Sequence, residues 1–257
     1  METIAYELKN NVAYLTIQSP PANALSSNLL QDLARYLDNV EQQEEAKAIV
    51  LTGEGKFFSA GADIKEFTSL QNASDYESLS VKGQELFDRI EGFQIPVIAA
   101  IHGAALGGGL ELAMACHIRI VAENAKLGLP ELSLGIIPGF AGTQRLPQYV
   151  GTAKAYEMIL SGEPISGSEA SVLGLANKAV AEEELIKETV KLAEKIAAKS
   201  KPSINRVMKL IPFAKTEQFA AGTKAEAKMF GEIFGSEDAK EGVQAFMEKR
   251  KPSFKDK

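Results

Sequence analysis

The chain has 257 residues, of which 45% are hydrophobic and 24% charged, an ordinary composition for a globular protein. Its formal charge of -6 argues against general nucleic-acid binding, which normally needs a basic face. The single cysteine, Cys116, excludes a disulfide within the chain, and no apolar run approaches the roughly 20 residues of a membrane span. The first residues lack the layout of a signal peptide, so we expect a cytoplasmic protein and a buried, structural Cys116.

The first half of the chain is rich in predicted strands. Apolar and polar residues alternate on either side of the Asn10-Asn11 turn, which predicts two short strands within residues 4–18. Helical spacing of leucines follows over 28–42, with Ser26 or Ser27 as the cap. Further strands are predicted at 46–53, at 56–60 before a break at Gly61, over the single apolar run 95–106, and within 118–132. Residues 68–93 are predicted to be helical in their second half.

Helices dominate from about Leu146 onward. The periodicity predicts them within 147–162, 166–174 and 181–200, and Pro202 interrupts the last of these. Helices are also expected within 202–215, 219–235 and 236–251. We expect a core of repeated strand-strand-helix units over 1–200 and a helical region over 201–257 that forms a subdomain or packs on a neighbouring subunit.

Common explanations for glycine-rich loops do not fit this sequence. The segment 162–168 has Ser168 where a phosphate-binding loop needs lysine, and 53–58 ends in Phe58 where a dinucleotide fingerprint needs glycine. Phe57 stands where a nucleophile elbow needs its first glycine. His102 and His117 are 15 residues apart, which makes no metal site on its own.

Two glycine turns are candidates for binding a negative oxygen. Gly107 to Gly109 lie between a predicted strand and a helix, where unpaired N–H groups and the helix dipole favour negative charge. Gly61 bends the chain in the second turn, and the small Ala62 leaves its own N–H open. Each turn alone is equally well explained as a tight turn. Together they predict an oxyanion site made by two loops.

Two glutamates stand in apolar surroundings beside these loops. Glu111 lies in the helix that follows the glycine run, and Glu131 follows Pro130. Burial and mutual proximity would raise their pKa values, as general acid–base chemistry at neutral pH requires. The alternative for Glu131 is a loop carboxylate that binds backbone N–H groups.

The segments 57–67, 99–120 and 126–146 resemble the crotonase superfamily, most closely the enoyl-CoA hydratases, and the likeness extends to 155–180 and over essentially the whole chain. It implies an α/β fold, a crotonase-like spiral of repeated ββα units with a C-terminal helical trimerisation region. It also implies assembly into trimers or hexamers, an acyl-CoA thioester substrate, and no metal or redox cofactor.

The resemblance assigns roles to individual residues. The N–H groups of Ala62 and Gly108 would hold the thioester oxygen, and Glu111 and Glu131 match the hydratase pair of acid–base residues. The segment Ala60, Gly61, Ala62, Asp63 and Ile64 would lie along coenzyme A, and Gly139 would lie near the catalytic water. The implied reaction is the reversible addition of water to the 2,3 double bond of a trans-2-enoyl-CoA. Phe140 and Ala141 depart from the smaller residues of many relatives, which leaves the acyl-chain preference open.

Other activities in the superfamily remain alternatives. Isomerases, decarboxylases and thioesterases keep the oxyanion hole and change the acid–base residues, so the presence of both glutamates favours hydration. A hydratase for branched or 3-methylglutaconyl-type substrates would keep both. A relative that binds acyl-CoA or RNA with little catalysis is a further alternative, and the acidic balance disfavours RNA. The sequence does not choose between fatty-acid oxidation, amino-acid breakdown and butyrate metabolism.

Overall fold

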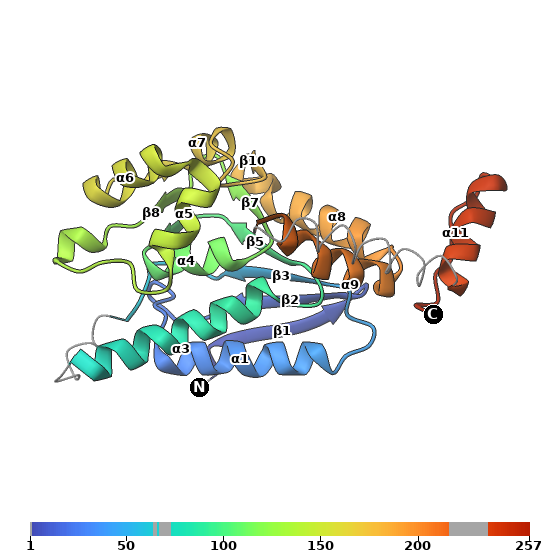
Figure 1. The fold of residues 1–257 in the computed structure, drawn as a ribbon, viewed down its shortest axis with the longest axis horizontal. Helices are drawn as coiled ribbons and strands as arrows, with labels where there is room; N and C mark the ends of the chain where they lie inside the picture. The colour runs from blue at the N-terminus through green and yellow to red at the C-terminus, as the bar shows by residue number, and fades with distance from the viewer. Residues whose placement is uncertain (1, 64–65, 67–72, 216–235) are drawn as a thin grey trace.

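Two β-sheets organise the molecule, as the computed structural model shows for residues 2–63, 66, 73–215 and 236–257 (Figure 1). Among these residues, the larger sheet has the spatial order β1 (Ile4–Lys9), β2 (Val12–Ile17), β3 (Ala48–Gly53), β5 (Val97–Ile101), β7 (Ile118–Ala122) and β10 (Lys178–Val180). The smaller sheet has the order β4 (Phe57–Ser59), β6 (Ala104–Leu106), β8 (Lys126–Gly128) and β9 (Ile165–Ser166).

The predicted N-terminal hairpin is present. β1 and β2 pair in antiparallel register from Ile4↔Ile17 to Lys9↔Val12. Asn10 and Asn11 turn the chain with φ angles of 52° and 61°, in the left-handed region that asparagine tolerates better than most residues. The remaining pairs of the larger sheet are parallel, from β2·β3 through β7·β10.

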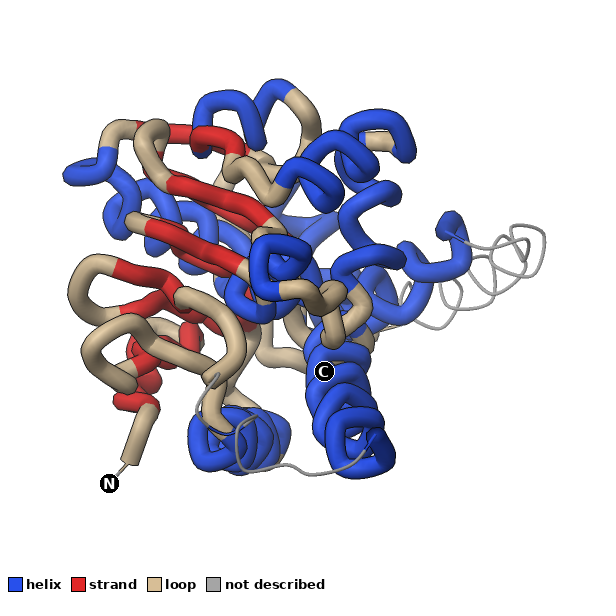
Figure 2. Tube along the Cα trace, turned by 90° about the vertical axis from the view of Figure 1, so that its left-hand side faces the viewer, coloured by secondary structure: helices blue, strands red, loops and turns tan. Residues whose placement is uncertain are grey.

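Helices cover the sheets and extend the molecule along its long axis (Figures 1 and 2). The α-helices are α1 (Ser27–Glu41), α3 (Ala73–Glu91), α4 (Gly108–Ala115), α5 (Gly142–Val150), α6 (Thr152–Ser161), α7 (Gly167–Val172), α8 (Leu185–Ala197), α9 (Lys201–Leu210) and α11 (Glu237–Met247). Short 3-10 segments are η1 (Glu131–Leu134), η2 (Glu182–Glu184) and η3 (Ile211–Lys215). Ser26 caps α1 by accepting a hydrogen bond from the N–H of Leu29, so the predicted helix start is confirmed.

The central strands of the larger sheet, β3, β5 and β7, are largely buried on both faces. On β5, Val97, Ala99 and Ile101 join the core that contains α1 and α4, whereas Ile98 and Ala100 join the core beneath α8. Strands covered by helices on both sides read as continuous apolar runs, and this explains why the sequence of β5 shows no alternation.

One predicted strand is two strands in the structure. The apolar run 95–106 breaks after Ile101, so that β5 lies in the larger sheet and β6 in the smaller one. Gly103 permits the break, because a Cβ at that position would lie 2.1 Å from the carbonyl oxygen of Lys56. The break matters for function because it delivers Gly107 and α4 to the end of the smaller sheet.

The mostly helical second half also contains strands that the periodicity did not predict. β9 and β10 have two and three residues, too few to show an alternating pattern. Pro202 lies in the first turn of α9, where its missing N–H costs nothing. The helix predicted within 219–235 lies outside the described residues, as do residues 68–72. The first half of the segment 68–93 was expected to be loosely ordered, and this is wrong from Ala73 onward, because α3 begins there.

Candidate active site

The glycine run places the start of α4 against the smaller sheet. Gly107 has φ 52°, and its N–H donates to the carbonyl of Gly128 on β8 at 2.9 Å. α4 therefore begins at Gly108, whose N–H has no partner within the helix. Gly109 packs so closely on β4 that a Cβ there would lie 2.3 Å from the carbonyl oxygen of Ser59. These contacts explain why the sequence needs consecutive glycines here.

The second glycine turn touches the first. Gly61 has φ 103°, and a Cβ on it would lie 2.9 Å from the carbonyl oxygen of Leu106 and 3.3 Å from the nitrogen of Gly108. Leu25 pairs with this turn through its N–H to the carbonyl of Gly61 and its carbonyl to the N–H of Asp63. That pairing skips the N–H of Ala62. Neither Ala62 nor Gly108 donates a backbone hydrogen bond to another described residue.

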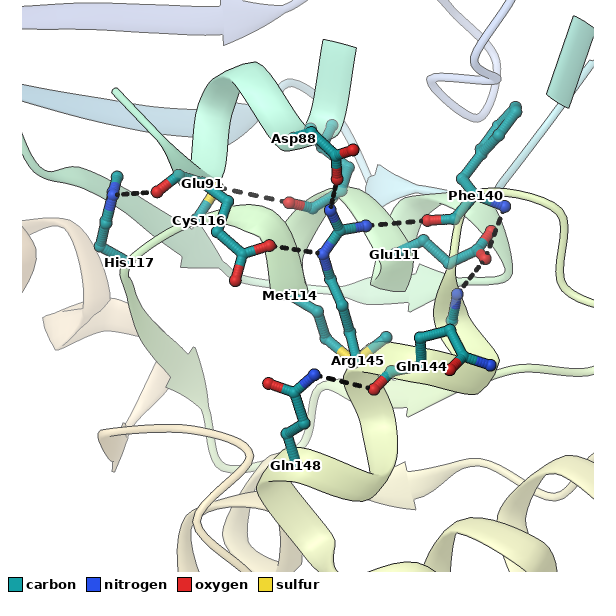
Figure 3. A network of polar contacts seen from close by, with 12 residues as sticks. Asp88, Glu91, Glu111, Met114, Cys116, His117, Phe140, Gln144, Arg145 and Gln148 are labelled. Carbon is teal, nitrogen blue, oxygen red and sulfur yellow. Dashed lines mark hydrogen bonds and ion pairs between the residues drawn. The ribbon is translucent and has the colours of Figure 1, made fainter. Parts of the chain in front are cut away.

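Glu111 is buried in the first turn of α4, with 1% of its surface exposed. Its Oε1 accepts hydrogen bonds from the N–H of Phe140 at 2.8 Å and of Gly142 at 2.7 Å (Figure 3). Burial raises the pKa of Glu111 to about 7, and the nearby Glu131 adds to the rise, while the two N–H groups and the charge of Arg145 oppose it. The carboxyl group is thus poised to exchange a proton near neutral pH.

Glu131 approaches the same turn from η1. Its Oε1 lies 3.1 Å from the place that a Cβ on Gly107 would take, so a side chain at that position would crowd this carboxyl group. Burial raises the pKa of Glu131. Its Oε2 is buried without a hydrogen-bond partner among the described residues. Backbone N–H groups therefore do not satisfy that oxygen, which counts against a purely structural role.

The loop between η1 and α5 forms a third wall of the site. Ala141 has φ 70°, in the left-handed region, and this turns the N–H groups of Phe140 and Gly142 toward Glu111. A Cβ on Gly142 would lie 2.8 Å from Oε1 of Glu111. Gly139, expected near the catalytic water, lies in this loop and its carbonyl accepts hydrogen bonds from α3.

Sequence reasoning missed the residues that hold this loop. Arg145 is 5% exposed, and its guanidinium donates to the carbonyl of Phe140 at 3.0 Å (Figure 3). It also forms ion pairs with Asp88 and Glu91 of α3. The sequence signal that could have identified Arg145 was a lone arginine on the apolar side of α5. Its partners lie more than fifty positions earlier, so no local pattern connects them.

The remaining residues of the predicted site lie beside the second turn, the one that contains Gly61. Ala60 follows β4 and donates its N–H to the carbonyl of Ala22 at 2.9 Å. Asp63 follows Ala62, and Ile64 lies outside the described residues.

The other candidates of the sequence have structural surroundings. Cys116 is buried, its thiol faces the carbonyl of Leu112, and burial raises the pKa of the thiol to about 12. It is the structural thiol that we predicted. His117 accepts a hydrogen bond from the N–H of Val97 at 3.0 Å, and His102 lies 3.0 Å from the carbonyl oxygen of Gly55. Within the described ranges, no helix has the length and apolar character needed to cross a bilayer.

Known proteins resemble this chain over nearly its full length. The family model described as "Enoyl-CoA hydratase/isomerase" matches residues 7–257. A protein of Bacillus subtilis (strain 168) named "Probable enoyl-CoA hydratase" is 59% identical over 256 residues, covering 99% of each chain. The "Short-chain-enoyl-CoA hydratase" of Clostridium acetobutylicum is 40% identical over 260 residues, covering 98% of this chain and 97% of its own.

Solved structures also resemble this one over nearly the whole chain. The crystal structure of enoyl-CoA hydratase from Bacillus anthracis superposes with a TM-score of 0.94 at 36% identity, covering 99% of this chain and 100% of that one. A structure from Geobacillus kaustophilus HTA426 gives a TM-score of 0.95 at 30% identity, covering 100% and 98%. The fold and the paired glycine turns thus define a crotonase-fold enzyme. The chain belongs to the enoyl-CoA hydratase/isomerase family.

Proposed function

We propose that this protein is a hydro-lyase that adds water reversibly across the 2,3 double bond of a trans-2-enoyl-CoA, giving a 3-hydroxyacyl-CoA. The observation that carries the proposal is the pair of buried carboxyl groups, Glu111 and Glu131, at the junction of the two glycine turns. The names of the relatives agree with this reaction. Fatty-acid β-oxidation, which uses the reaction, is part of the proposal.

The glycine turns supply the oxyanion site of the proposed mechanism. When water attacks the β-carbon of the enoyl thioester, negative charge develops on the thioester oxygen. The N–H groups of Ala62 and Gly108 hold that oxygen, and the dipole of α4 adds to their effect. The contact between Gly61 and the start of α4 supports this arrangement, because it brings the two turns together.

The two carboxyl groups transfer the protons. Glu111 holds the water and takes its proton as the oxygen bonds to the β-carbon, and Glu131 delivers a proton to the α-carbon. Burial raises both pKa values. The proposed hydration requires Glu111 to be ionised and Glu131 to be protonated when the enoyl substrate is bound. The reverse sequence removes water from a 3-hydroxyacyl-CoA.

Coenzyme A would lie along the second glycine turn, the one that contains Gly61. Ala60, Gly61, Ala62 and Asp63 are assigned this contact through the family resemblance, together with Ile64. The reaction balances with water, substrate and protein groups alone, so we propose that no cofactor takes part. The cytoplasmic location stays a prediction.

Conservative substitution of each glutamate tests the mechanism. We expect Glu111→Gln and Glu131→Gln each to lower kcat for a short enoyl-CoA by at least about a hundredfold, because each removes a proton-transfer group. Glu157→Gln on α6, an exposed glutamate, is the matched control and should keep the activity. Initial rates at 263 nm over a series of acyl lengths and branched substrates also measure specificity. Wild-type rates in both active-site variants would contradict the proposal.

We propose further that the chain assembles as a trimer or hexamer, with the helical region 201–257 at subunit contacts. Large apolar side chains stand exposed in this region, namely Ile211, Val243 and Val207 at 58%, 54% and 51%, and also elsewhere, as on Val172 at 87%. Such exposure is typical of surfaces that associate. Sedimentation equilibrium gives the mass directly, and a monomer at micromolar concentration would contradict the assembly.

A further inference from the structure

α3 presents a polar stripe to the loop that binds Glu111. Its members recur at intervals of four, four and three residues and therefore share one side of the helix. They are Ser80, Gln84, Asp88 and Glu91. The first two donate to the carbonyl of Gly139, from Oγ at 2.5 Å and from Nε2 at 2.9 Å. The last two reach the loop through Arg145.

Arg145 is a buried cation, and each of its three guanidinium nitrogens has a partner. Nη2 lies 2.5 Å from Oδ1 of Asp88, Nε lies 3.0 Å from Oε2 of Glu91, and Nη1 donates to the carbonyl of Phe140 at 3.0 Å (Figure 3). A planar guanidinium held at three points has little freedom. The carbonyl that it binds is therefore fixed relative to α3.

That carbonyl lies between the two N–H groups that bind the carboxylate. The N–H of Phe140 and the N–H of Gly142 both donate to Oε1 of Glu111, and the carbonyl of Phe140 accepts from Arg145. The intervening Ala141 is left-handed, a conformation that a non-glycine residue adopts only when its surroundings impose it. The guanidinium supplies part of that constraint.

We infer that Arg145 is a positioning residue for catalysis: it fixes the two peptide N–H groups that orient the carboxylate of Glu111 and keeps a positive charge beside it. This inference rests on the proposed role of Glu111. It assigns to α3 a task beyond packing, because the ion pairs of Asp88 and Glu91 hold Arg145 in place.

The charges around Glu111 come from three elements packed near it. Glu131 on η1 is the like charge, and Arg145 on α5 is the opposite charge. Asp88 and Glu91 on α3 lie on the far side of the guanidinium and partly neutralise it. Loss of the Arg145 charge would raise the pKa of Glu111, so its carboxyl group would ionise at a higher pH.

A second buried arginine provides a matched control. Arg119 is 2% exposed and donates to the carbonyls of Ala113 and Cys116 at the other end of α4, and to that of Leu175. Its hydrogen bonds and its contact with the ring of Tyr149, as far as the described residues show, do not involve the loop 139–142. Arg119→Met therefore removes a buried cation and its hydrogen bonds without touching the site.

The experiment compares Arg145→Met with Arg119→Met. Both variants should have a lower Tm. Only Arg145→Met should lose kcat for crotonyl-CoA, by about a hundredfold with little change in KM, because small misplacements of a reacting group are costly. Only that variant should move the Glu111-dependent limb of the pH–rate profile to higher pH. Equal kcat and equal pH limbs in the two variants would overturn the inference.

Two further variants keep the test decisive. Arg145→Lys retains the charge and loses the three-point hold, so we expect a reduced kcat with a pH limb close to wild type. If Arg145→Met does not fold, this variant carries the test, and a wild-type kcat in it would overturn the inference.

Glu111→Gln separates the two proposals. An inactive Glu111→Gln beside an unaffected Arg145→Met removes only the role of Arg145, whereas an active Glu111→Gln removes the proposed function.

Discussion

Glu111 lies where a negative charge is costly. Burial raises its pKa from the ordinary value of 4.5 to about 7. Because the pKa in the folded state exceeds that in the unfolded state, the folded state binds the proton more tightly. The stabilising contribution of the protonated group is complete below about pH 4.5 and is lost as the pH rises to about 7. At alkaline pH the protein therefore carries a destabilised carboxylate, in keeping with a residue retained for chemistry.

Removing that charge should stabilise the protein at alkaline pH. We expect Glu111→Gln to gain about 2 kcal/mol more relative to wild type at pH 8 than at pH 5, since a shift of one pKa unit corresponds to about 1.4 kcal/mol. Urea unfolding of both proteins at both pH values measures this difference. A gain that is equal at the two pH values would contradict a raised pKa for Glu111.

At the scale of elements, the site depends on glycines where two loops meet. Gly61 combines a positive φ of 103° with close contacts to Leu106 and Gly108, whereas Gly55 has φ 80° and no atom within 4 Å of a notional Cβ. A substitution at Gly55 therefore tests the cost of the backbone conformation alone. The same substitution at Gly61 adds crowding at the proposed oxyanion site.

Alanine at these two positions should give different results. Gly61→Ala and Gly55→Ala should both lose stability, by roughly 1–2 kcal/mol for an unfavourable backbone conformation. Only Gly61→Ala should also lower kcat, by about a hundredfold, because its Cβ would displace the start of α4 and the N–H of Gly108. Steady-state rates together with thermal unfolding measure both effects. Equal kcat values in the two variants would argue against convergence of the loops.

Local patterns predicted the elements whose signals are complete within a few residues. The Asn10-Asn11 hairpin and the Ser26-capped helix α1 belong to this class. Glu111 and the glycine run were also visible in the sequence, because a carboxylate and three glycines violate the pattern of an apolar helix. The break at Gly103 was not visible, since its cause is the carbonyl of Lys56, a residue in the turn before β4.

The support of the site could not be predicted for the same reason. Arg145 meets Asp88 and Glu91 only after α3 and α5 pack around α4, and periodicity within each helix identifies no partner in the other. Glu131 approaches Gly107, the residue before α4, through a similar long-range contact, and its charge acts on Glu111. Sequence resemblance named both residues, and the structure adds what holds Glu111 and which oxygen of Glu131 is unpartnered.

At the scale of the whole molecule, the C-terminal tail is joined to the core. Asp256 forms an ion pair with Lys47 at 2.8 Å, just before β3, and also accepts from the N–H of Lys201 at the start of α9 at 2.9 Å. Asp238 on α11 accepts from the N–H groups of Lys255 and Asp256. These contacts link the region 201–257 to residues of the region 1–200. If these contacts are strong, the two regions on either side of the proposed boundary at residue 200 have to unfold together.

Asp256→Asn tests that coupling. Lys47 has a side chain 9% exposed, whereas that of Asp256 is 29% exposed, so we expect a loss of about 1–2 kcal/mol, less than for a fully buried pair. Asp38→Asn, which weakens the more exposed pair with Arg89, is the control and should cost less than about 1 kcal/mol. Urea unfolding should remain a single transition in both variants, with kcat unchanged because neither residue approaches the glutamate pair. An early separate transition in Asp256→Asn would show that the C-terminal region unfolds independently, and equal losses in the two variants would show that the Lys47 pair adds no special stability.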